Sequence, residues 1–362
     1  MKKVGLIINP ISGMGGKVGL KGTDGPETLH LAILSGAIPE SEQKTRQTLQ
    51  QLLSIKNALL FFTASHSLGE ELLFEFGFNY QVLHNAATPS TQRDTIEFLR
   101  SLMKEEVDLL LFAGGDGTAR DIFNEVKLSI PVVGIPTGVK IHSSVFAKSP
   151  AEAGRLAFEY LTNQTLTLVE REVVDIDEEA FRQDKIITDI IGYLKVPLSE
   201  QYLQHLKAPT PQSDEQAQIS IALQVIDDME KDSFYIIGSG STTHHILNEL
   251  NLPSTLLGVD IIKNKQLIAK DVNEQEILEI IGQEKVKLVV SPMGNQGYIF
   301  GRGNQQLSDK VLSRIEKDNL IIISTPFKLK ALKGRPLLTY TGNEILDKKL
   351  SGFYRVITGY GQ

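Results

Sequence analysis

The chain contains no cysteine. It therefore cannot form disulfides, bind a metal through thiolates or use a thiol as a nucleophile. It also lacks any run of about eighteen uninterrupted apolar residues, the length a membrane-spanning helix needs. The apolar stretch after Lys3 ends at Asn9 and is too short for a signal peptide. We therefore expect a cytoplasmic protein.

An excess of positive charge is missing as well, because the formal net charge is −7. A broad nucleic-acid-binding surface is therefore not expected, and any affinity for phosphate must come from local sites. The sequence shows no internal repeat and no low-complexity segment. Its 362 residues are enough for two domains, each with its own core.

Strands and helices alternate through the first part of the chain. The predicted strands cover residues 3–8, 58–63, 80–83, 107–113 and 132–135. The predicted helices between them cover residues 40–55, 68–76 and 90–104. This alternation predicts an α/β domain with a doubly wound parallel sheet, which binds ligands at the carboxyl ends of its strands. We assign it to residues 1–148.

The pattern changes in the second part of the chain. Alternating apolar and polar positions predict a strand over residues 166–176, and residues 186–196 and 219–226 are further strand candidates. Residues 207–218 are rich in turn formers and are expected to be an exposed loop. A strand, a glycine turn and a helix then return over residues 234–250, and another alternating unit covers residues 277–323.

These features predict a mainly β second domain that contains an embedded α/β unit. We assign it to residues 149–344. Residues 345–362, with a predicted strand over 354–358, are a candidate for rejoining the first domain.

The most informative segment is Gly114-Gly115-Asp116-Gly117-Thr118, which follows a predicted buried strand and precedes a run with helical spacing. Three glycines around one carboxylate let the backbone approach a charged ligand closely, with a helix N-terminus facing it. A carboxylate in such a place indicates proton abstraction or metal binding. The alternative is a tight turn in which Asp116 caps the helix.

The same predicted helix carries two more candidates after this segment. Asn124 could reach a ribose hydroxyl or a metal-bound water. Glu125 is either functional or a solvated surface residue.

A second glycine-rich turn, residues 9–17, follows the first predicted strand. It is not a P-loop, because Ile11 stands where the first glycine belongs and Val18 where a serine or threonine would bind Mg²⁺. It is either a donor-rich turn in which Asn9, Ser12 and Gly13 contact a phosphate, or a plain connection between a strand and a helix.

Polar groups also follow the predicted strand at 132–135. Thr137, Lys140 and Ser143 offer hydrogen-bond donors there, and Lys140 could balance the charge of a transferred phosphate. His142 is expected to be a structural or hydrogen-bonding residue rather than a base.

Two segments of the second domain carry similar chemistry. Gly240, Ser241 and Thr242 follow a predicted strand and could bind the phosphates or adenosine of a nucleotide. Residues 291–306 are rich in amides, which indicates either a structural loop or recognition of a polar ligand such as a base or a phosphate. The candidates in this segment are Asn295, Gln296, Arg302 and Asn304.

These motifs together resemble the NAD kinase and diacylglycerol kinase fold superfamily. Residues 114–118 match its defining motif, and Gly240-Ser241-Thr242 resembles the Gly-Ser-Thr segment of NAD kinases. The closest likeness is to the ATP-NAD kinase branch that includes the acetoin-catabolism X proteins, and it is carried by residues 21–25, 134–140, 256–260 and 301–306.

The resemblance implies a site between the two domains. There Asp116 would deprotonate the adenosine ribose 2′-hydroxyl of NAD or NADH for attack on the γ-phosphoryl of ATP. Mg²⁺ or another divalent metal would assist, although the sequence identifies no metal ligands. The expected partners are small nucleotides rather than nucleic acid or membrane, and a homo-oligomer is expected.

Residues 136–145 replace a glycine-rich segment of standard NAD kinases, and the Asn-Asp pair of those enzymes has no counterpart that we can assign. The identity of the acceptor therefore stays open, and a kinase of another nucleoside, a lipid or a polyol is the second hypothesis. The sequence also leaves open whether ATP or polyphosphate is the donor. A nucleotide sensor without catalytic activity is the third hypothesis.

Overall fold

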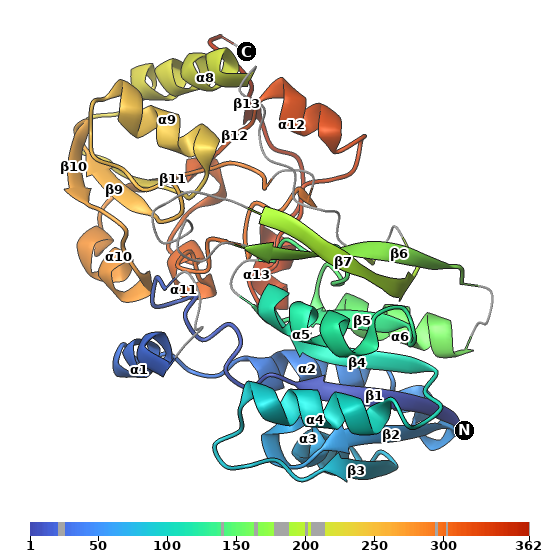
Figure 1. Ribbon diagram of the computed structural model, residues 1–362. Helices are drawn as coiled ribbons and strands as arrows, with labels where there is room; N and C mark the ends of the chain where they lie inside the picture. The colour runs from blue at the N-terminus through green and yellow to red at the C-terminus, as the bar shows by residue number, and fades with distance from the viewer. Residues whose placement is uncertain are drawn as a thin grey trace.

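The computed structural model describes residues 1–20, 26–138, 141–162, 166–176, 188–199, 202–203, 214–293, 296–301 and 303–361. The described chain forms two lobes, each built on its own sheet (Figure 1). The N-terminus lies in the lower lobe and the C-terminus at the far end of the upper one. No helix among the described residues is both long and apolar enough to cross a membrane.

The lower lobe contains the parallel sheet that the sequence predicts. Its strands are β1 (Lys2–Ile8), β2 (Leu59–Ala64), β3 (Tyr80–His84), β4 (Leu109–Gly114) and β5 (Val132–Pro136). They are arranged in the order β3-β2-β1-β4-β5, and all neighbours are parallel. The central strands are buried on both faces, which explains why β4 is an uninterrupted apolar run.

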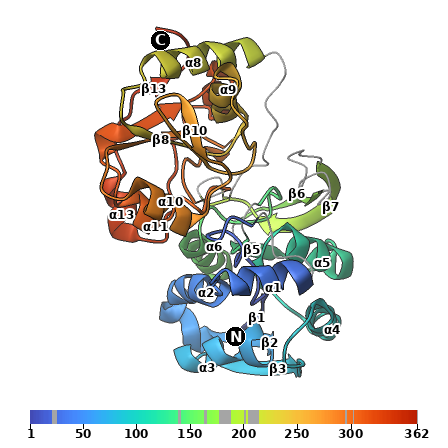
Figure 2. The ribbon, with the colours of Figure 1, turned by 90° about the vertical axis from the view of Figure 1, so that its left-hand side faces the viewer.

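Helices cover both faces of this sheet (Figure 2). One face carries α4 (Gln92–Leu102) and α5 (Asp116–Val126), and the other carries α2 (Ser41–Gln50), α3 (Glu70–Phe76) and α6 (Pro150–Thr162). The remaining helical segments of this lobe are α1 (Pro26–Leu34) and the 3-10 turns Leu53–Ala58 and His66–Leu68.

An antiparallel hairpin of β6 (Leu168–Ile176) and β7 (Thr188–Pro197) packs on α5 and β5. Its side chains Val173 and Leu194 belong to the same hydrophobic core as the first sheet, and that core extends to Leu203. We therefore propose that the first unit runs through Leu203, later than the boundary expected at residue 148.

The upper lobe contains a six-stranded sheet in the order β10-β9-β8-β11-β12-β13. Its strands are β8 (Phe234–Ile237), β9 (Asp260–Lys263), β10 (Gln266–Ala269), β11 (Val286–Val290), β12 (Leu320–Ile323) and β13 (Val356–Ile357). Strands β8, β11, β12 and β13 are parallel to one another. Strand β9 is antiparallel to β8, and β10 is antiparallel to β9. The second domain is thus rich in strands and contains an α/β unit. Together with the parallel sheet of the first lobe, it confirms the predicted α/β fold class.

The helices of the upper lobe also lie on two faces. Apolar side chains of α8 (Glu215–Asp227) and α9 (Ser241–Glu249) form one core with the sheet. Those of α10 (Glu274–Ile281), α11 (Asp309–Leu312) and α13 (Glu344–Lys349) form the other. The short helix α12 (Pro326–Ala331) follows β12, and Lys317–Asn319 is a 3-10 turn.

Three predictions for the second part of the chain are wrong, one of them only in part. Residues 219–226 are not a strand but the centre of α8, whose buried positions Ile221, Ala222, Val225 and Ile226 recur at helical spacing. The same helix takes in residues 215–218 of the expected loop, whose residues 207–213 lie outside the described part. The last strand, β13, does not return to the first domain, because it pairs with β12 in the second sheet.

Candidate functional site

In the first sheet, successive strands are added first on one side of β1 and then on the other. The chain runs outward from β1 through β2 to β3 and then returns to the other side of β1 as β4 and β5. The carboxyl ends of β1 and β4 are therefore neighbours at the place where open α/β sheets bind ligands. We name the described turn residues that meet there, 9–13, 114–118, 137–138 and 141–143, the first switch point.

Asp116 is the first residue of α5, and it lies at the first switch point with only 7% of its surface exposed. Its Oδ1 accepts the backbone N–H of Ser143 at 2.9 Å, and its Oδ2 accepts that of His142 at 2.8 Å. The Nδ1 atom of His142 lies 3.3 Å from the same Oδ2. The carboxylate is thus oriented by the segment after β5, which the alternative of a simple helix cap does not require.

Glycines allow these turns to meet. A Cβ atom on Gly13 would lie 2.0 Å from the carbonyl oxygen of Thr137, and the φ angle of Gly13 is +86°. A Cβ atom on Gly138 would lie 2.8 Å from the Cα of Gly115. Such approaches exclude larger side chains, so the backbones of three separate turns are in direct contact.

Several predicted site residues lie at this junction. The Nδ2 atom of Asn9 donates to Oγ1 of Thr118 at 3.1 Å, which links the turns after β1 and β4. Ser12 is buried and its carbonyl accepts the hydroxyl of Ser41. The Oγ1 atom of Thr137 is buried without a hydrogen-bond partner among the described residues. Because buried polar groups normally have a partner, this hydroxyl is a candidate contact for a ligand or a water.

Lysines on α2 and in the turn after β1 bring positive charge near the same turns. Lys44 donates to the carbonyl of Thr137 at 3.4 Å and pairs with Glu40 at 3.0 Å. Lys17 pairs with the other oxygen of Glu40 at 2.9 Å. Burial alone would raise the pKa of Glu40, but the charges of Lys44 and Lys17 outweigh it and lower that pKa below its usual value. Glu40 is therefore ionised at neutral pH and holds both lysines in place.

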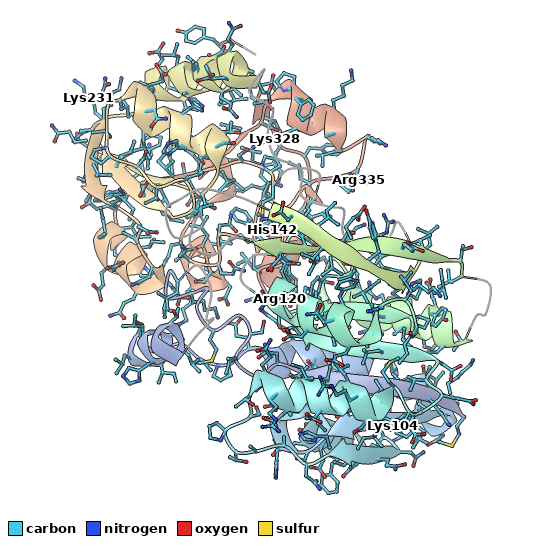
Figure 3. All side chains as sticks on the ribbon, in the orientation of Figure 1. Lys104, Arg120, His142, Lys231, Lys328 and Arg335 are labelled. Carbon is cyan, nitrogen blue, oxygen red and sulfur yellow. The ribbon has the colours of Figure 1, made fainter. Side chains whose placement is uncertain are left out.

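The second domain contacts the segment that orients Asp116. The Nε2 atom of Gln296 donates to the carbonyl of Ile141 at 3.2 Å, and the hydroxyl of Tyr298 donates to the carbonyl of Lys148. Figure 3 places His142 between the two lobes. The contacts agree with a site between the domains, as the resemblance implies.

Other predicted residues of the second domain lie at the end of β8 or in the loop after β11. Gly240 is the N-cap residue of α9 and has a φ angle of +129°. Ser241 and Thr242 begin that helix. The side chain of Asn304 donates to the carbonyl of Ile299 at 2.9 Å, and its Oδ1 is buried without a partner among the described residues.

Two of the predicted site residues are not brought to Asp116. Asn124 is exposed, and it follows Asp116 by about 12 Å along the helix axis. Glu125 accepts two hydrogen bonds from Arg100 on α4, both of 3.2 Å, so it holds two surface helices together.

Three further candidates, Lys140, Asn295 and Arg302, lie outside the described residues, as does the motif at 21–25. Sequence reasoning missed Lys44 and the role of the 142–143 backbone. The only signal for Lys44 is its spacing of four residues from Glu40 in a predicted helix, and that spacing is common on surface helices.

The described residues contain no group of three or more His, Asp or Glu side chains that could hold a metal ion on their own. Mg²⁺ commonly binds one or two carboxylates together with substrate phosphates. Asp116 can supply one such oxygen. The residues therefore fit a metal that is held mainly by the phosphates of a bound nucleotide.

Comparison with known proteins identifies the family of the chain. Residues 4–165 match the ATP-NAD kinase N-terminal domain, and residues 230–362 match the ATP-NAD kinase C-terminal domain. A search of curated proteins finds no match. Because the two matched domains together span most of the 362 residues, the chain belongs to the ATP-NAD kinase family and is a kinase.

Proposed function

We propose that this kinase transfers the γ-phosphoryl group of ATP to the adenosine ribose 2′-hydroxyl of NAD or NADH, with Asp116 as the general base. The observation that carries the proposal is the Asp116 carboxylate, which two backbone N–H groups from residues 142 and 143 hold at the first switch point. A group fixed in this way can orient a hydroxyl for attack and accept its proton.

Phosphoryl transfer depends on positioning and on charge neutralisation more than on covalent chemistry. Suitable parts for it are glycine turns that bring three backbone segments into contact, one oriented carboxylate, and the lysines Lys17 and Lys44. A divalent metal would be bound through nucleotide phosphates with Asp116 as one ligand, and it would neutralise phosphate charge. Asn9, Ser12, Thr118 and Thr137 are the proposed nucleotide contacts in this lobe.

The finer expectations from the sequence remain part of the proposal. They are a place in the acetoin-catabolism X branch, ATP rather than polyphosphate as the donor, a homo-oligomeric state and a cytoplasmic location. The donor can be tested by supplying ATP or polyphosphate separately in the same assay.

The direct test is formation of NADP from NAD, ATP and Mg²⁺ by the purified protein. We expect Asp116→Asn to lower kcat by about 10²-fold to 10⁴-fold, the usual contribution of a positioned base. Asp121→Asn on the same helix is the matched control and should keep the activity of the wild type.

Failure of the wild type to phosphorylate either NAD or NADH would reject the acceptor. Lipid and nucleoside acceptors would then be tested, with nucleotide binding without turnover favouring the sensor. If Asp116→Asn retained activity within a few-fold of the wild type, the role of Asp116 as the base would be rejected.

A further inference from the structure

The second sheet has a switch point of its own. The chain runs outward from β8 through β9 to β10 and then returns to the other side of β8 as β11, β12 and β13. The carboxyl ends of β8 and β11 are therefore neighbours, like those of β1 and β4 in the first sheet. We name the residues that follow these two strands and β12, at 238–243, 291–292 and 324–328, the second switch point.

A buried lysine lies at this second switch point. Lys328 is only 7% exposed, although lysine is rarely buried. Its Nζ donates to Oγ1 of Thr242 at 2.8 Å and to Oγ of Ser291 at 3.3 Å. Thr242 lies in α9 after β8, and Ser291 follows β11, so the ammonium group joins the segments that follow these two strands. Figure 3 shows Lys328 in the upper lobe.

The surroundings of Lys328 are rich in hydroxyl groups. Thr242, Thr243, Ser291, Ser324 and Thr325 are all buried at this edge of the sheet. Hydroxyls can donate hydrogen bonds to anionic oxygens. The two hydroxyls that accept from Lys328 fix the position of its ammonium group.

The turn after β8 leads directly into the N-terminus of α9. Gly240 combines φ +129° with ψ 160°, a conformation that is essentially restricted to glycine. Its N–H is bonded to the carbonyl of Leu256 at 2.9 Å, and α9 begins at the next residue. The hydroxyl of Ser239 fixes the other side of the turn by donating to the carbonyl of Gly303 at 2.9 Å.

We propose that the second switch point binds a phosphate group of a nucleotide, with Lys328 as the positive charge and Thr242 and Ser291 as the hydroxyls that position it. Lysine acts as a compact point charge toward phosphate, and backbone N–H groups at a helix start complete the donor set. This inference does not depend on which acceptor the kinase uses. It assigns Lys328, which no sequence motif indicates, and Ser291, which begins the amide-rich segment at 291–306 but is not among its candidates.

The test is isothermal titration calorimetry of the full chain with ADP, with inorganic pyrophosphate and with adenosine. Lys328→Gln removes the charge but keeps a hydrogen-bond donor for Thr242. We expect it to weaken binding of ADP by about tenfold or more, the loss typical of one hydrogen bond between charged groups. Binding of adenosine should not change. Lys330→Gln, an exposed position on the same helix, is the matched control and should bind ADP like the wild type.

Ser291→Ala keeps the lysine and should cause a smaller loss of ADP affinity, so the proposal can be judged even if Lys328→Gln does not fold. A parallel loss of pyrophosphate affinity identifies a site that also takes free phosphate compounds. A loss confined to ADP identifies a nucleotide site. ADP affinity that is equal in the wild type, Lys328→Gln and Ser291→Ala would overturn the proposal and make Lys328 a structural cation. Because binding is measured without turnover, this result is independent of the Asp116 test.

Discussion

The two sheets share one strand order up to their fifth strand but present opposite charges at their switch points. In the first sheet the carboxylate of Asp116 is oriented by backbone N–H groups. In the second sheet the ammonium of Lys328 is oriented by hydroxyl oxygens. In our two proposals the fold determines where each site lies, while one charged side chain determines what it can bind.

This difference suggests a division of labour between the lobes. A carboxylate suits the approach of a hydroxyl group and its proton, whereas an ammonium suits phosphate. The contact between Gln296 and Ile141 joins the second lobe to the segment that orients Asp116. The binding of a ligand that contacts both lobes would therefore also depend on how the lobes are positioned relative to each other.

The largest expected difference between the two switch points is the loss of stability when a glycine in their turns is replaced by alanine. In Gly13→Ala the new Cβ would lie 2.0 Å from the backbone oxygen of Thr137, in addition to the strain of φ +86°. We expect a loss of about 3 kcal/mol or more in the free energy of unfolding. In Gly240→Ala the nearest atom is Oγ1 of Thr243 at 3.8 Å, so only backbone strain of about 1–3 kcal/mol remains.

Urea unfolding of both variants measures this difference. Equal losses would show that the contact at Gly13 relaxes freely, and would contradict the tight junction of the three turns. Gly36→Ala is a control for strain alone, because φ is +78° there and the new Cβ would meet nothing within 4 Å.

The first lobe could be predicted from the sequence because its signals are local. Each buried parallel strand is an apolar run that ends at glycine or polar residues, and helices such as α4 and α5 have apolar positions at helical spacing. The second lobe was harder because α8 contains several β-branched residues. Ile219, Ile221, Val225 and Ile226 favour a strand by composition, although the buried positions follow a helix.

The candidate sites could be predicted only where their residues are contiguous in the sequence. Asp116 and its glycines are contiguous, so the motif is visible in the sequence. Lys328 is 86 residues from Thr242 and 37 from Ser291, and only the strand order brings the three together. Glu125 was a candidate because it shares a helix with Asp116, but its interaction with Arg100 depends on how α4 packs on α5.

Ionised carboxylates in the two lobes should also contribute differently to the pH dependence of the free energy of unfolding. Burial raises the pKa of Asp94, but hydrogen bonds from His84, Thr91 and Ala87 outweigh it and hold that pKa well below its usual value. Asp94→Asn should cost about 2 kcal/mol at pH 7, a typical loss for hydrogen bonds to a buried charge. Because the pKa is lowered in the folded state, this contribution is complete well above about 3.9, the unfolded value, and disappears at lower pH.

In the second lobe, hydrogen bonds from Lys285 and Lys287 lower the pKa of Glu230 to about 2. Glu230 is exposed, so water screens the interaction and Glu230→Gln should change stability much less. Urea unfolding between pH 2 and pH 7 tests the pair. A gap between the wild type and Asp94→Asn that stayed constant across this range would contradict the lowered pKa.

A smaller effect is expected from the link between the turns of the first switch point. Asn9→Ala removes the bond to Thr118 at 3.1 Å, and Thr118→Val removes its acceptor. We expect each variant to lose about 1 kcal/mol and the pair to show a coupling energy of about 0.5–1 kcal/mol in a double-mutant cycle. Additive losses would mean that Asn9 and Thr118 do not interact in solution.

The smallest effect is expected at the far end of α5, where the sequence and the structure make different predictions. If Glu125 bound a nucleotide, Glu125→Gln would lower the rate of NADP formation or weaken the binding of ATP. The structure instead pairs it with the exposed Arg100, and exposed ion pairs add little to stability. We therefore expect kcat, KM and the midpoint of thermal unfolding of Glu125→Gln to equal those of the wild type within error. A clear rise in KM for ATP would extend the site along α5 and would show that the carboxylate exchanges Arg100 for the nucleotide.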